Sequence, residues 1–157
     1  MELKELVEGF GATLKIEGLS LDAEGNAAFS ADGMWVGIAG NANARTFSLT
    51  GRIGEPPAEG RDRLERMLLK TNALLSSESG MSVGLDADDR YVLLTSCEYT
   101  YMTLEAFAEK VEAFLNELER LCAVLEGFSS QAEEVERAMA DSAAEARNLS
   151  EGGYLQV

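Results

Sequence analysis

Thr46-Phe-Ser-Leu-Thr-Gly-Arg-Ile53 alternates apolar and polar positions over its whole length. Such alternation is typical of a strand in an antiparallel sheet that has one face buried. The buried face would then carry one set of residues: Phe47, Leu49, Gly51 and Ile53. Gly54-Glu-Pro-Pro57 follows directly and ends the strand, because proline has no N–H to donate to a sheet.

Upstream of this strand, the sequence predicts shorter strands separated by tight turns. Ala27–Ser30 is predicted to be a strand that returns from Leu19–Leu21, and Met34-Trp-Val-Gly-Ile38 is predicted to be the next strand. The Asp32-Gly33 pair between them indicates a hairpin turn, since glycine readily takes the positive φ that such turns need. Leu19–Leu21 is expected to be another short strand, followed by a turn at Asp22–Gly25.

Downstream, the sequence predicts a helix and a second hairpin. The helix covers residues 61–75, and its apolar side carries Leu64, Met67, Leu68 and Leu75. Its polar face holds the basic residues Arg61, Arg63, Arg66 and Lys70. Met81–Leu85 and Arg90–Cys97 then form strands that pair across the acidic turn Asp86-Ala-Asp-Asp89.

Two more segments have the apolar spacing of amphipathic helices. Residues 2–14 form the first, with Leu3, Leu6, Val7, Phe10 and Leu14 on one side. The other begins after Thr103, a suitable N-cap residue, and keeps one apolar stripe from Leu104 to Leu125. We expect this long helix to cover one face of the sheet and to end at Gly127.

Composition limits the classes of partner. The chain has 157 residues, a net charge of −15 and no histidine. So negative a protein would be repelled by nucleic acid and by anionic membranes, whereas basic partners are permitted. Whether the charge selects a partner or only keeps the protein in solution is left open.

No segment resembles a signal peptide or a membrane span, and Cys97 and Cys122 form no disulfide or metal motif. These features favour a reduced, cytoplasmic protein.

The residues that usually carry catalysis are missing or poorly placed. Without histidine, a general base would have to be a carboxylate with a raised pKa. The adjacent pairs Asp88-Asp89 and Glu133-Glu134 fall in a turn and in a polar tail, where solvated acids are the simpler interpretation. The chain has no cluster of cysteine or histidine for zinc and no complete calcium loop. We therefore expect no enzyme, no metal and no cofactor.

The apolar residues say more about the function of the protein than the polar residues do. A five-strand sheet covered by helices on one face cannot bury all the apolar side chains of the N-terminal half, and exposed apolar patches usually mark interaction sites. For Phe29 and Trp35 the pattern leaves core and binding surface equally open. For Leu21 and Ile38 it favours the core.

Composition changes near residue 126. Residues 126–157 contain seven acids, two bases and many alanines and serines. We therefore divide the chain into a folded domain, residues 1–125, and an acidic C-terminal extension, residues 126–157, that is partly helical or mobile.

Four short segments follow one another along the chain: Gly18-Leu-Ser-Leu-Asp22, Met67-Leu-Leu-Lys-Thr-Asn72, Val83-Gly-Leu-Asp86 and Tyr91-Val-Leu-Leu94. In this order, they resemble the class I type III secretion chaperones, the Tir-chaperone-like family. The resemblance covers roughly residues 2–125, with the long helix closing the domain. It implies an α+β fold of order α-β-β-β-α-β-β-α, in which helices cover a twisted antiparallel sheet.

The resemblance also implies a function. Members of the family are cytoplasmic homodimers that bind the N-terminal region of a secreted effector in extended form and keep it competent for secretion. The implied effector-binding residues are Leu3, Leu6, Phe10, Leu19, Leu21, Phe29, Trp35 and Val36. The implied dimer interface is Leu64, Met67, Leu68 and Leu75. The alternative is a regulatory interaction protein of the same fold, which would sequester a regulator or a secretion component.

Overall fold

The order of elements is α-β-β-β-α-β-β-α, the order that the family resemblance implies. The structure, a computed structural model, describes residues 1–153, except the side chains of residues 132, 133, 135, 136, 139, 146 and 149–153. Its elements are α1 (Leu3–Leu14), β1 (Asn26–Ala31), β2 (Met34–Asn41), β3 (Thr46–Gly54), α2 (Arg61–Glu78), β4 (Met81–Leu85), β5 (Tyr91–Glu98) and α3 (Leu104–Gly153).

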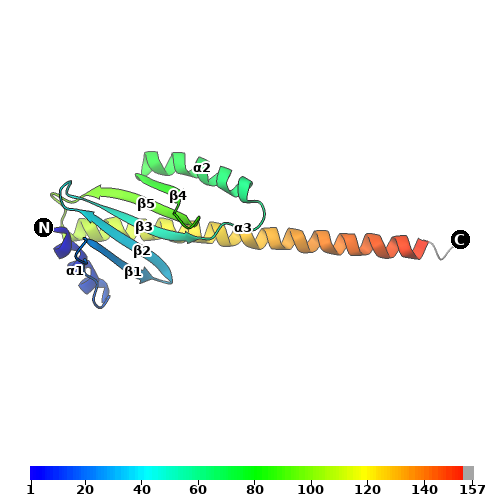
Figure 1. Ribbon diagram of the computed structural model, residues 1–157, viewed down its shortest axis with the longest axis horizontal. Coiled ribbons are helices and arrows are strands. Elements are labelled where there is room, and N and C mark those ends of the chain that lie inside the picture. Colours follow the sequence, from blue (N-terminus) through cyan, green and yellow to red (C-terminus); the bar gives the residue numbers. More distant parts are fainter. Residues whose placement is uncertain (154–157) are drawn as a thin grey trace.

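The five strands form one antiparallel sheet in the order β1-β2-β3-β5-β4, which leaves β1 and β4 at the two edges (Figure 1). The alternation predicted for β3 is confirmed, because Phe47, Leu49, Gly51 and Ile53 all point into the core. The hairpin between β1 and β2 turns at Asp32 and Gly33, whose φ angles of 49° and 81° are both positive, as the sequence predicted.

All three helices pack on one face of the sheet. In Figure 1, α3 crosses behind the strands, α1 lies beside β1, and α2 lies beside β4. A row of phenylalanines joins the layers: Phe10 of α1 meets Phe29 and Phe107 edge-on, with ring centroids 5.8 and 5.7 Å apart. Phe47 of β3 continues the row, 5.2 Å from Phe107. Each such pair contributes about 0.5–1.5 kcal/mol beyond the apolar area it buries.

The predicted start of α3 is confirmed. The backbone N–H of Ala106 donates to Thr103 Oγ1 over 3.1 Å, so Thr103 caps the helix. The predicted stripe is buried against the sheet: Phe107, Val111, Phe114, Leu118 and Leu121. In the described part of the chain, no helix has an apolar run of the length that a bilayer crossing requires.

The segment Leu19–Leu21 does not form the strand that we predicted. It runs from α1 to the turn at Asp22 without regular structure. Leu19 is buried against α1 instead, where a Cβ on Gly11 would come within 2.9 Å of the leucine Cβ. The Asp22 carboxylate accepts hydrogen bonds from the N–H groups of Glu24 and Asn26, and this bonding closes a loop in place of a hairpin.

The prediction that the last helix ends at Gly127 is also wrong, because α3 continues to Gly153. Gly127 lies in the helix interior, its φ is not positive, and a Cβ there would meet no atom within 4 Å. The alanines and glutamates that follow favour helix and outweigh one glycine. The division of the chain near residue 125 stays a prediction, and residues 154–157 of the predicted extension lie outside the described ones.

Gly127→Ala should therefore stabilise α3. Alanine is favoured over glycine in a helix interior by about 1 kcal/mol, and the new methyl group has open space around it. Circular dichroism at 222 nm should show higher helicity, and thermal denaturation a melting temperature no lower than that of the wild type. Lower helicity in the variant would mean that Gly127 ends the helix in a left-handed conformation after all.

Candidate functional site

The sheet face opposite the helices has no covering layer among the described residues. Strand register places mostly small and polar residues on it, together with Trp35 and Leu94, and these are exposed or half-buried; Val92, opposite Arg52 on the same face, is buried. We call this surface the open face, and it comprises Ala28, Ser30, Trp35, Gly37, Ala39, Ser48, Thr50, Arg52, Leu94 and Ser96. A shallow sheet face that is left uncovered in this way can receive another polypeptide chain.

Trp35 is the largest side chain on the open face. Its indole lies flat across Gly37, where a Cβ would fall 2.6 Å from the ring. The Arg52 guanidinium stacks on the ring, with Cζ 4.2 Å from the ring centroid. Beside the indole lies a hollow of about 430 Å³, lined in part by Ala28 and Thr50. Trp35 is therefore fixed in place while remaining half-exposed.

Strand β1 has a free edge next to the open face. Both backbone groups of Asn26 bond to Asp22: the N–H donates to Asp22 Oδ1 over 2.8 Å, and the C=O accepts from the Asp22 N–H over 2.7 Å. Asn26 thus faces away from β2, and alternation along the strand turns the N–H and C=O groups of Ala28 and Ser30 the same way. Within the described residues, no backbone hydrogen bond outside the sheet occupies these groups.

The opposite edge, β4, is closed by α2. Asn72 Oδ1 accepts the outward N–H of Val83 over 2.9 Å, and Ser76 Oγ lies 3.5 Å from the outward C=O of Met81. These side chains occupy positions that an added strand would need. The two edges of the sheet therefore differ, and β1 is the one that can accept a further strand.

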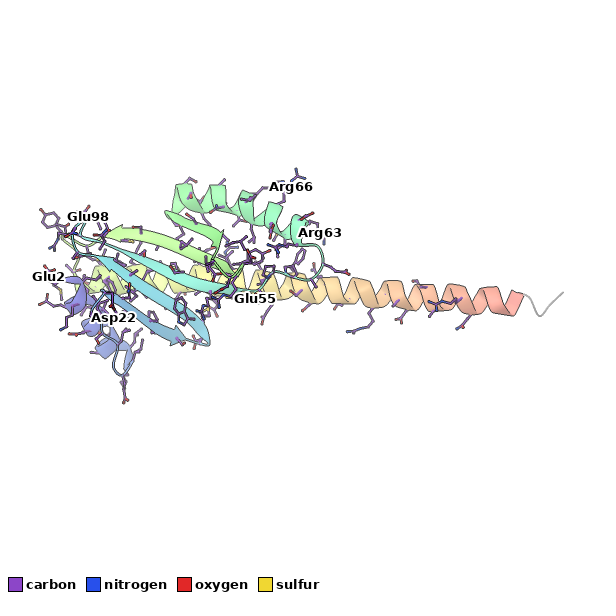
Figure 2. The ribbon with its side chains drawn as sticks, in the orientation of Figure 1. Glu2, Asp22, Glu55, Arg63, Arg66 and Glu98 are labelled. Carbon is purple, nitrogen blue, oxygen red and sulfur yellow. The ribbon has the colours of Figure 1, made fainter. Side chains whose placement is uncertain are left out.

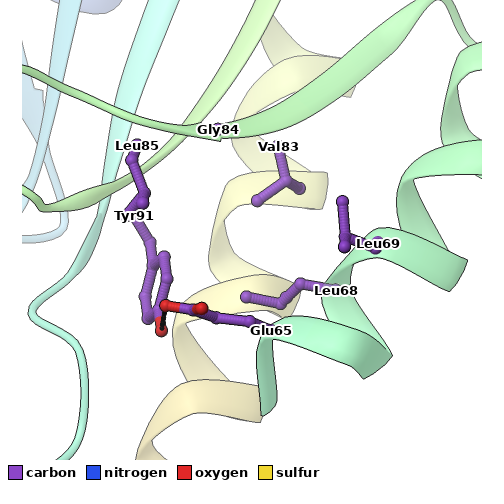
Figure 3. Close-up of a pocket in the computed structure, with 7 residues that line it drawn as sticks. All are labelled: Glu65, Leu68, Leu69, Val83, Gly84, Leu85 and Tyr91. Carbon is purple, nitrogen blue, oxygen red and sulfur yellow. Dashed lines mark hydrogen bonds between the residues drawn. The ribbon is translucent and has the colours of Figure 1, made fainter. Parts of the chain in front are cut away.

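A groove of about 300 Å³ lies between α2 and β4 (Figure 3). Its apolar rim includes Leu69, which is 69% exposed, and Leu85, which is 47% exposed. At one end, the Tyr91 hydroxyl donates to Glu65 Oε1 over 3.0 Å, and Arg61 Nε donates to the same oxygen over 2.6 Å. The hydrogen bond from Arg61 lowers the pKa of Glu65, whereas burial, followed by the bond to Glu65, raises the pKa of Tyr91 to about 12.

Most of the predicted effector-binding residues are buried within the single chain. Leu3, Leu6, Phe10, Leu19, Phe29 and Val36 belong to the hydrophobic core, whereas Leu21 and Trp35 are half-buried. For Phe29 the structure thus places the side chain in the core, because α1 and α3 cover the face to which it points. Of the predicted set, Leu21 and Trp35 offer surface to a partner, and the binding role of the set stays a prediction.

The predicted dimer residues divide in the same way. Leu64, Leu68 and Leu75 are buried beneath α2 in their own chain, and Met67 is 40% exposed. Sequence reasoning missed Leu69, because it falls outside the apolar stripe of the helix. It also missed the backbone of Ala28 and Ser30. The signal that could have identified them is their place in the first strand of the chain, because such a strand often lies at a sheet edge.

The basic residues predicted on α2 belong to a protein that is acidic overall. Figure 2 labels Glu2, Asp22 and Glu98 toward the end that holds the N-terminus, and Arg63 and Arg66 on α2. The predicted basic face of α2 exists, but Arg61 pairs with Glu65, and Arg63 lies over the ring of Phe128, 5.4 Å from its centroid. Among the residues that the structure describes, no three acidic or cysteine side chains gather as metal ligands would.

Comparison with known proteins shows one family and a shared fold. The model of the Tir chaperone protein (CesT) family matches residues 5–135. No curated protein sequence matches the chain significantly. The fold resembles the ExsC–ExsE complex (TM-score 0.68, 22% identity, 80% of this chain and 97% of that one) and the HopA1–SchA chaperone–effector complex (0.64, 17%, 76% and 92%). It also resembles the Yersinia pestis type III secretion chaperone SycH bound to a YscM2 fragment (0.58, 21%, 75% and 98%).

Tyr91→Phe should lower the free energy of unfolding by about 1 kcal/mol, because the hydroxyl bond to Glu65 is lost. In the wild type, the Tyr91 phenol has a pKa of about 12 when folded and about 10 when unfolded. Its contribution is therefore complete below pH ~10 and disappears as the pH rises toward 12. Urea denaturation across this range should show less alkaline destabilisation in the variant. Tyr101→Phe, at a ring that is 94% exposed, is the control and should change neither quantity.

Proposed function

Because the chain belongs to the Tir chaperone protein (CesT) family, we propose that it acts as a type III secretion chaperone that holds the N-terminal region of a secreted effector extended on β1 and the open face. Proteins of this family are binding proteins and not enzymes, and the same is true of this chain. The bound segment would remain unfolded and competent for secretion. We place the protein in the cytoplasm, where its two free cysteines would stay reduced.

The observation that carries this proposal is the difference between the two sheet edges. An extended segment can add to β1 through the N–H and C=O groups of Ala28 and Ser30, which face outward and belong to a strand without charged residues or proline. At β4, Asn72 and Ser76 already occupy the corresponding positions. Strand addition gives affinity through backbone hydrogen bonds that do not depend on the sequence of the effector.

The open face supplies contacts for the side chains of such a strand. Side chains alternate along an added strand, so every second one would point to the open face. The one next to Ala28 would lie above the hollow beside Trp35. The small side chain of Ala39 also lines this hollow. The net charge of −15 favours effector segments that carry lysine and arginine, because opposite charge speeds the encounter.

We further propose that the chaperone is a homodimer formed through the groove between α2 and β4. Leu69 and Leu85 are among the most exposed large apolar side chains described, and they line the same groove. Covering them with the equivalent groove of a second copy would remove an apolar surface from water. The dimer would leave the β1 edge, at the other side of the sheet, available to the effector (Figure 1).

Ala28→Pro should weaken effector binding and leave the fold intact, because it removes an outward N–H that no strand of the sheet uses. Ala28→Val keeps the N–H and serves as the matched control. Each tagged protein would be purified from its native host and treated with protease, and the protected peptides identified by mass spectrometry. We expect the N-terminal segment of a secreted protein with wild type and Ala28→Val, and its loss with Ala28→Pro. Recovery of a regulator or a secretion component instead would favour the regulatory alternative.

Leu69→Asp should convert the dimer into a monomer, because it would bury an unpaired charge in the interface. The 16.9 kDa chain should then show its own mass by light scattering, where the wild type shows twice that mass. Ser77→Asp adds the same charge on the exposed side of α2 and should remain a dimer. An unchanged dimer in Leu69→Asp would place the interface elsewhere.

A further inference from the structure

At the hairpin end of β1 and β2, the helix layer leaves a groove. α1 lies toward the opposite end of these strands, the end that holds the N-terminus, where its Leu3 is against Gly40 of β2 (Figure 1). At the hairpin end, Ala31 and Met34 point to the helix side of the sheet and are only half-buried. A hollow of about 750 Å³ lies between the hairpin, the end of β3 and α3. We call this hollow the hairpin groove.

The hairpin groove combines an apolar floor with acidic walls. Its apolar lining includes Met34, Ile53, Ala123 and Leu125. Its carboxylates belong to Asp32, Glu55, Glu119 and Glu126. All four acids are exposed, and none of them forms a salt bridge within the part of the chain that the structure describes. Arg52 also lines the groove, but its guanidinium stacks on the Trp35 ring at the open face. The lining therefore holds negative charge that no base offsets.

The thiol of Cys122 responds to this charge from inside the groove. It donates to the C=O of Ile53 over 3.5 Å, so it lies between α3 and the end of β3. Burial raises the pKa of the Cys122 thiol, and the carboxylates of Glu126 and Glu119 raise it further. Both carboxylates thus disfavour a second negative charge in the groove, and for the same reason they favour a cation there.

The hairpin groove begins where a strand added to β1 would end. Ser30 is the last residue of β1 whose backbone groups face outward, and the turn at Asp32 and Gly33 that follows is part of the groove. An effector segment that continues past Ser30 therefore reaches the groove directly. Helices form the rest of this layer of the fold, and an amphipathic helix can place apolar side chains on the floor and basic ones beside the acids.

We propose that the hairpin groove binds a short amphipathic helix of the effector, one that carries lysine or arginine beside its apolar stripe and directly adjoins the strand held on β1. This inference rests on the proposed function and adds selectivity to it. Strand addition uses backbone groups that every effector has, whereas the groove distinguishes basic from acidic side chains.

Fluorescence anisotropy with two synthetic peptides tests the groove on the full-length chain. Each labelled peptide has about 18 residues, or five helical turns, with leucine on one face; the other face carries lysine in one peptide and glutamate in the second. We expect the lysine peptide to bind and to protect Cys122, but not Cys97, from alkylation, as read by mass spectrometry. The glutamate peptide should do neither. The double variant Glu119→Lys/Glu126→Lys should weaken binding of the lysine peptide about tenfold or more.

Glu109→Lys/Glu112→Lys is the matched control. It changes the net charge by the same amount at two exposed positions of α3 that do not line the groove. It should weaken binding less than about threefold, because salt screens distant charges. Equal weakening by the two double variants, or alkylation of Cys122 that the lysine peptide leaves unchanged, would overturn the inference.

The effector itself separates this inference from the proposed function. Among the protease-protected peptides recovered from the native host, those from Glu119→Lys/Glu126→Lys should lack the basic amphipathic part and keep the strand. Wild type and Glu109→Lys/Glu112→Lys should protect both parts. Identical protected peptides from the two double variants would overturn the inference and leave the proposed function intact. Failure of the wild type to protect any segment of a secreted protein would instead overturn the proposed function, and this inference with it.

Discussion

The packing of α3 directly onto β3 is the contact on which the rest of the structure depends. Gly51 favours it: a Cβ at this position would fall 2.6 Å from a Leu118 methyl group and 3.1 Å from the Phe114 ring, so any larger residue would have to displace these two buried side chains. Gly51 also lies in the middle of the sheet, opposite Val36 of β2 and Leu93 of β5. The helix therefore covers the centre of one face, and α1 and α2 take the positions on its two sides.

Covering one face of the sheet this fully has a consequence for the other. The helices of the described chain are all on the same side, and the opposite face keeps small residues around Trp35 instead of a second apolar layer. The same arrangement of helices also determines which edge of the sheet is free. Because α2 packs beside β4, its Asn72 can satisfy the outward N–H of Val83, whereas α1 packs under β1 and leaves the edge of that strand open. The proposed effector site follows from these two asymmetries more than from any single side chain.

Much of the secondary structure could be predicted because its signals are local. Alternation identified the buried side of β3, the Asp32-Gly33 pair identified a turn, and Thr103 identified the start of α3. Failures arose where a local signal competed with another interaction. Leu19 was predicted to be a strand residue, but its side chain is buried against α1 instead. Gly127 looked like a helix end, but the residues on both sides of it favour helix, and nothing there requires a left-handed turn.

The candidate site was less predictable, because the sequence identifies apolar residues without saying which of them stay exposed. Phe29 and Val36 looked suited to a binding surface and are buried, whereas the free groups of Ala28 and Ser30 belong to the backbone, which every residue shares. By itself, the sequence determined the order of the elements, the buried side of each amphipathic segment and the strongly negative charge, since these depend on spacing and composition. Only the tertiary structure decided which strand lies at which edge and which edge is closed, because these depend on contacts between segments far apart in the chain.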